Sequence, residues 1–100
     1  MKTNLNAWLK DKNNVDEKHS WIHKTLECND GTTLSVQASQ YHYCKPREDF
    51  ADSYRKVEVW FVTATVPCAW KEYGGDENPY AYIPIELVEE FIDLHGGIKS

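Results

Sequence analysis

The chain lacks the features of membrane, secreted and disulfide-stapled proteins. No apolar run approaches the about 20 residues that a membrane-spanning helix needs, and no signal peptide pattern opens the sequence. Three cysteines, an odd number without a CxxC pair, do not form a disulfide framework. These absences predict a cytoplasmic protein, and a length of 100 residues predicts one domain, 1–100.

Patterns typical of catalysis and of metal binding are also missing. The chain has no Gly-rich phosphate loop, paired-carboxylate signature or serine elbow. Cys44 stands near His42 and Arg47, but no oxyanion loop and no third group to orient the histidine is recognisable. His19 and His23 on a predicted strand lie about 13 Å apart, too far to share one metal ion. We therefore predict a protein that is not an enzyme, with no catalytic residue, no metal and no cofactor.

The charge that is present is concentrated in the second half of the chain. Residues 1–50 hold seven Lys or Arg and seven Asp or Glu, whereas residues 51–100 hold four and nine, so the whole net charge of −5 arises there. An acidic surface repels nucleic-acid phosphates, which argues against generic nucleic-acid binding. It can occupy a basic groove on a partner protein, although acidic surfaces also simply aid solubility. The candidate acidic surface consists of Asp76, Glu77, Glu86, Glu89, Glu90 and Asp93.

Apolar periodicity predicts a short helix and a β-hairpin in the first half. Leu5, Trp8 and Leu9 have helical spacing, and Asn13 and Asn14 end the segment. Alternating patterns over 21–28 and 32–39 flank the turn 29–31, which is typical of a hairpin, and the second pattern places Leu34, Val36 and Ala38 inward.

The second half predicts two strands and a closing helix. The segment 56–66 alternates, with Val57, Val59 and Phe61 on one face. Because the other face is also substantially apolar, the segment is expected to be the central strand; that face carries Trp60, Val62, Ala64 and Val66. A short strand over 80–83 precedes a helix that begins with Pro84 in its first turn and ends at Gly96 or Gly97. The order predicts an α+β fold, a four-stranded, mainly antiparallel sheet with both helices packed on one face.

Two long connections carry most of the candidate binding residues. Aromatic rings and a cation can stack on and hold a nucleotide, but a protein interface uses the same residue types. In the alternative reading the tyrosines pin the first connection to the core and its arginine pairs with neighbouring carboxylates. The candidates are Tyr41, His42, Tyr43 and Arg47 in 40–55, and Trp70 and Tyr73 in 68–79.

Several stretches resemble small, uncharacterised accessory proteins of bacteriophages and prophages of Gram-positive bacteria. They are 6–12, 38–47, 57–59 and 82–97, and the most distinctive reads Ser-Val-Gln-Ala-Ser-Gln-Tyr-His-Tyr-Cys-Lys-Pro-Arg over 35–47. The resemblance implies an accessory protein that binds and disables host machinery, including CRISPR effectors or nucleotide-signalling pathways. It implies no catalytic residue.

Three hypotheses follow. The first is an anti-CRISPR-like inhibitor, in the host cytoplasm, that binds a host protein through the acidic surface. The second is a sponge that sequesters a nucleotide-like signalling molecule at Tyr41, Tyr43, Arg47 and Trp70, alone or across a homodimer. The third is a virion or assembly component.

Overall fold

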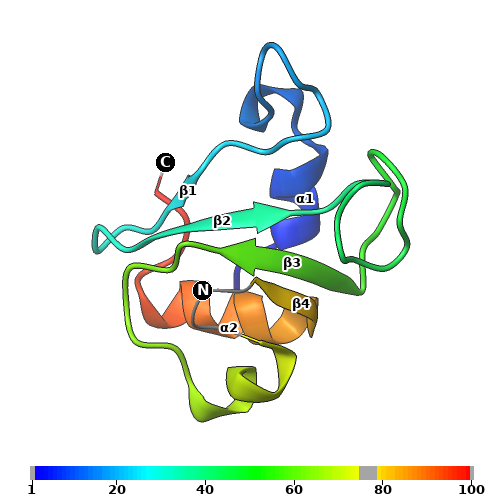
Figure 1. The fold of residues 1–100 in the computed structure, drawn as a ribbon. Helices are drawn as coiled ribbons and strands as arrows, with labels where there is room; N and C mark the ends of the chain where they lie inside the picture. The colour runs from blue at the N-terminus through cyan, green and yellow to red at the C-terminus, as the bar shows by residue number, and fades with distance from the viewer. Residues whose placement is uncertain (1, 75–78, 100) are drawn as a thin grey trace.

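The computed structural model describes residues 2–74 and 79–99 and contains a four-stranded sheet with two α-helices (Figure 1). The strands are β1 (Leu26–Glu27), β2 (Thr33–Gln37), β3 (Lys56–Trp60) and β4 (Tyr80–Pro84). The helices are α1 (Leu5–Lys10) and α2 (Ile85–Leu94), with 3₁₀ turns η1 (Lys12–Asn14) and η2 (Cys68–Tyr73). The α+β prediction is confirmed.

The sheet has the order β1-β2-β3-β4, and every neighbouring pair is antiparallel. Because side chains alternate along a strand, the register places Leu34, Val36, Val57, Val59 and Ile83 on one face. All five are fully buried in one core, to which the helices contribute Leu5, Leu9, Ile85, Val88, Phe91 and Ile92. We call this the core face of the sheet, and the opposite side the outer face.

The predicted hairpin is confirmed, but its first strand is shorter than expected. Gly31 adopts the left-handed φ of 94° that its turn requires, and the amide of Cys28 donates to the carbonyl of Thr32. Only Leu26 and Glu27 form β1, because His23 is bridged to Val15 and its own backbone groups bond to a side chain of β2. The amide of His23 donates to Oε1 of Gln37, and Nε2 of Gln37 donates to the carbonyl of His23, both at 2.8 Å.

The prediction that the strand at 56–66 is continuous was wrong, because β3 ends at Trp60. Phe61 has a left-handed φ of 54°, which turns the chain out of the strand and leaves the residue 79% exposed. Phe61 therefore does not share the core face with Val57 and Val59. Further along, Thr63 still contacts the sheet, where its amide donates to the carbonyl of Thr33, the first residue of β2, at 3.0 Å.

The two ends of the chain are tied together at α2. The side chain of Asn4 caps α1 by accepting from the amide of Ala7. The amide and hydroxyl of Thr3 donate to Oδ1 of Asp93, and the amide of Leu5 donates to Oε2 of Glu89 at 2.9 Å. Pro84 is the last residue of β4 and the N-cap of α2, one position before the predicted first turn.

Candidate binding site

A buried carboxylate on the outer face positions the loop 41–47. Glu58 is 5% exposed although it lies on the side of β3 that faces away from the core. Its Oε2 accepts from the amide of Tyr43 at 3.0 Å, and its Oε1 accepts from the indole Nε1–H of Trp60 at 2.8 Å. Both carboxylate oxygens are thus satisfied, and the loop is fixed to the centre of the sheet.

Backbone hydrogen bonds then fasten the same loop to β3 and β4. The amide of Lys45 donates to the carbonyl of Lys56, and the amide of Arg55 donates to the carbonyl of Lys45. On the other side, the amide of Tyr82 donates to the carbonyl of Tyr43 at 3.1 Å. These bonds bring residues from three separate segments to one place.

The result is a groove of about 690 Å³ that is lined by cations and by no acidic side chain; we call it the basic groove. Among the residues described, Lys45, Arg47 and Arg55 make no ion pair. Arg47 lies 5.8 Å from the centre of the Tyr43 ring, and the Tyr43 and Tyr82 rings are 5.9 Å apart. The lining residues are Cys44, Lys45, Pro46, Arg47, Arg55 and Tyr82.

Of the predicted loop residues, only Arg47 lines this groove; Tyr43 lies beside it, next to Arg47 and Tyr82, and Tyr41 and His42 lie outside it. His42 is half-buried, with Nδ1 2.6 Å from Oγ of Ser39, and burial lowers the pKa of its imidazole. Tyr41 is exposed, and its ring contacts Trp21 edge-on at 5.6 Å. His42 therefore holds the loop. The alternative reading was wrong, because Tyr41 and Tyr43 are exposed and Arg47 makes no ion pair with Glu48, Asp49 or Asp52.

The second connection does not join the basic groove. Trp70 has no exposed surface and packs against the rings of Phe91 and Tyr80 in the core, so it cannot stack on a ligand beside Tyr43. Tyr73, the last residue of η2, is half-buried and does not line the groove.

The predicted acidic surface divides into two groups. Glu89 and Asp93 accept hydrogen bonds from Leu5 and Thr3, so they hold the N-terminal segment. Glu86 and Glu90 are exposed on α2. Asp76 and Glu77 lie outside the described residues.

The cysteine in the basic groove is held as a buried thiol. Cys44 has no exposed surface, and its Sγ donates to the carbonyls of Ser39 and Pro46. Burial raises the pKa of this thiol, which disfavours the nucleophilic thiolate. Within 2–74 and 79–99, no three His, Cys, Asp or Glu side chains come close enough to hold a metal ion. No helix in the described part of the chain has the length and apolar character needed to cross a membrane.

Sequence reasoning missed Lys45, Arg55 and Tyr82. Lys45 stands two positions before Arg47, so its charge was visible as part of the loop. Arg55 and Tyr82 reach the groove only through the backbone bonds to Lys45 and Tyr43, and a single sequence carries no signal for such contacts.

Searches found no protein family, curated protein or solved structure that matches this chain. The resemblance to phage accessory proteins therefore stays a prediction.

Proposed function

We propose that this chain is a binding protein that sequesters a nucleotide-like ligand in the basic groove. The observation that carries the proposal is the set of three cations, unpaired among the described residues, beside the Tyr43 and Tyr82 rings. A cation without a carboxylate partner can bind a phosphate without first breaking an ion pair.

Each part of the groove has a distinct role in this proposal. The guanidinium groups of Arg47 and Arg55 bind phosphate oxygens, since their planar donors match that geometry, and Lys45 adds a point charge. The partly exposed rings of Tyr43 and Tyr82 stack on the base, a contact worth about 1–3 kcal/mol per base. A ligand with both a phosphate and a flat ring uses both features.

Binding without turnover fits the surroundings of the groove better than catalysis does. Cys44, the nucleophile type nearest the cations, is buried and donates its S–H to backbone carbonyls. The role of a sponge also agrees with the phage resemblance, because sequestering a host nucleotide signal needs affinity and no chemistry.

Thermal unfolding with a panel of ligands tests the proposal. The panel contains ATP, GTP and cyclic dinucleotides, each beside its nucleoside and beside inorganic triphosphate. A ligand at 100 times its Kd stabilises a protein by about 2.7 kcal/mol, which gives a clear rise in Tm. At least one nucleotide is expected to raise the Tm more than its nucleoside does and more than inorganic triphosphate does.

Three variants test whether the nucleotide binds in the basic groove. Arg47→Ala and Arg55→Ala are expected to weaken binding by about 10- to 100-fold, the loss of one charged hydrogen-bonding group, and Tyr43→Ala by about 10-fold. Lys24→Ala removes an exposed cation elsewhere and serves as the control. The proposal fails if no nucleotide stabilises the protein, or if Lys24→Ala weakens binding as much as Arg47→Ala.

A further inference from the structure

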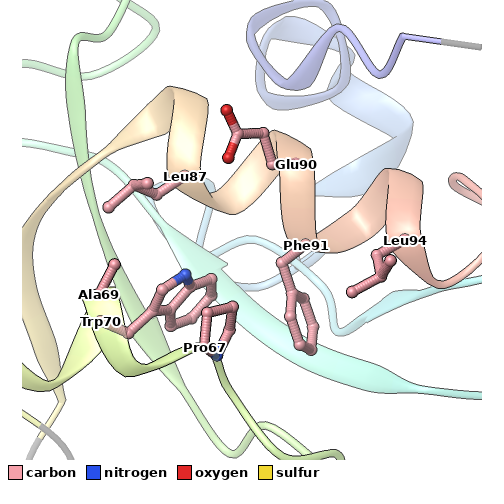
Figure 2. A pocket seen from close by; sticks show the side chains of 7 residues that line it. All are labelled: Pro67, Ala69, Trp70, Leu87, Glu90, Phe91 and Leu94. Carbon is pink, nitrogen blue, oxygen red and sulfur yellow. The ribbon is translucent and has the colours of Figure 1, made fainter.

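A second depression lies between η2 and α2, and we call it the helix groove (Figure 2). Its volume is about 290 Å³, at the lower limit of pockets that hold small molecules and enough for one or two apolar side chains. Leu94, a residue that is 76% exposed, extends the apolar surface beyond it. The lining residues are Pro67, Ala69, Trp70, Leu87, Glu90, Phe91 and Leu94.

Acidic side chains accompany this apolar surface on α2. Glu90 lines the helix groove between Leu87 and Leu94, and Glu86 is one turn earlier on the same side of the helix. Both glutamates are exposed, and neither makes an ion pair with any residue in the described part of the chain. The α2 sequence has no Lys or Arg. An occupant that complements this face is therefore apolar and cationic.

A buried donor without an acceptor lies at the floor of the helix groove. The indole Nε1–H of Trp70 has no hydrogen-bond partner within 2–74 and 79–99, although the side chain is fully buried. Figure 2 shows this nitrogen on the edge of the ring that faces α2, toward Leu87 and Glu90. An unsatisfied buried donor is unfavourable, so an occupant that brings a carbonyl oxygen to it is stabilised by the new hydrogen bond.

We propose that the helix groove docks a basic amphipathic segment of a partner protein. Apolar side chains of the segment fill the space beside Phe91 and Leu94, and its Lys or Arg side chains pair with Glu86 and Glu90. A backbone carbonyl of the segment accepts from Nε1 of Trp70 after the half-buried Leu87 side chain turns aside. This interface is separate from the basic groove and does not depend on the ligand proposed there.

A synthetic peptide supplies the probe. A helical peptide of about 15 residues carries Leu at i, i+3, i+4 and i+7 and Lys on the flanking positions; a matched peptide carries Glu in place of every Lys. Binding is followed through the indole N–H resonance of Trp70, assigned by its contacts with the Phe91 and Tyr80 rings. The Leu/Lys peptide is expected to bind and move this resonance downfield, as a new hydrogen bond does. The Leu/Glu peptide is expected not to bind.

Surface variants keep the test independent of folding. Glu90→Lys and Leu94→Ala change exposed residues. They are expected to weaken binding of the Leu/Lys peptide at least tenfold and about fivefold, respectively. Glu17→Lys changes an exposed glutamate far along the chain from α2 and is expected to leave affinity within twofold.

Four results would overturn the proposal. They are an unmoved Trp70 resonance, equal binding of the Leu/Glu peptide, and equal loss of affinity in Glu17→Lys and Glu90→Lys. The fourth is the same Trp70 shift on raising the protein concentration without peptide, which would show self-association instead.

Discussion

The two faces of the sheet are both covered, but by different chemistry. On the core face, Leu34, Val36, Val57 and Val59 are buried and apolar, and they hold the helices by packing. On the outer face, Gln37 and Glu58 are equally buried but polar, and each holds a separate segment of chain by hydrogen bonds. Apolar burial therefore builds the fold, whereas the polar residues of the outer face position the loop that carries the basic groove.

The largest effect is expected on the core face. Leu34→Ala removes a fully buried side chain and is expected to lower the free energy of unfolding by about 2–5 kcal/mol. Ser35→Ala, at the next position on the outer face, removes one acceptor for Nε2 of Gln37 and is expected to cost about 1 kcal/mol. Urea denaturation of both variants measures the difference; equal losses would break the distinction between the two faces.

A smaller loss of stability, with a local consequence, is expected at Glu58. Glu58→Ala leaves the amide of Tyr43 and the indole N–H of Trp60 without their acceptor, which costs about 1–3 kcal/mol. Because the same carboxylate fixes the loop, hydrogen exchange at the Tyr43 amide is expected to accelerate more than exchange at Val36. Glu27→Ala, which removes an exposed ion pair with Lys99, is the control and is expected to cost under about 1 kcal/mol. Unchanged exchange at Tyr43 would contradict the positioning role.

The sequence predicted the core face well and the outer face poorly. Alternation identified Leu34, Val36, Val57 and Val59, and the turn 29–31 identified the hairpin, because both signals are local. Glu58 between two valines is typical of a solvent-facing position, and it is buried here only because loop 41–47 folds over it. The loss of strand structure after Trp60 depends on a left-handed backbone at Phe61, a residue type that rarely adopts it, so no local signal indicated it.

The stability of the chain also depends on pH through His23, whose backbone is held by Gln37 of the outer face. His23 is buried, its Nε2 donates to the carbonyl of Leu9, and burial lowers its pKa below the ordinary 6.5. The unfolded chain therefore binds a proton at a higher pH than the folded chain does. The stability contributed by neutral His23 is fully present above about pH 6.5 and is lost as the pH falls from there toward the lowered pKa.

His23→Gln removes this titration. The free energy of unfolding, measured by urea denaturation between pH 7.5 and 5.5, is expected to depend less on pH in the variant than in the original chain. The exposed His19→Gln is the control. An identical pH dependence in the original chain and His23→Gln would exclude His23 as the source.

The smallest effect is expected where β3 leaves the sheet. Phe61 adopts a left-handed φ of 54° with its ring in solvent, so it bears backbone strain with little compensating burial. Phe61→Gly is expected to raise the free energy of unfolding by about 0.5–1 kcal/mol, since glycine adopts this conformation without a Cβ clash. Phe61→Ala, which keeps the Cβ, is expected to give no gain. Destabilisation by Phe61→Gly would show that the exposed ring contributes packing.

The most direct test of the central claim is an NMR titration of the amide-labelled chain with the nucleotide that stabilises it most. We predict that the largest shifts occur at Tyr43, Lys45, Arg47, Arg55 and Tyr82, and that Arg47→Ala abolishes them at the same ligand concentration. Shifts that centre on another surface, or that persist in Arg47→Ala, would contradict the assignment of the basic groove as the binding site.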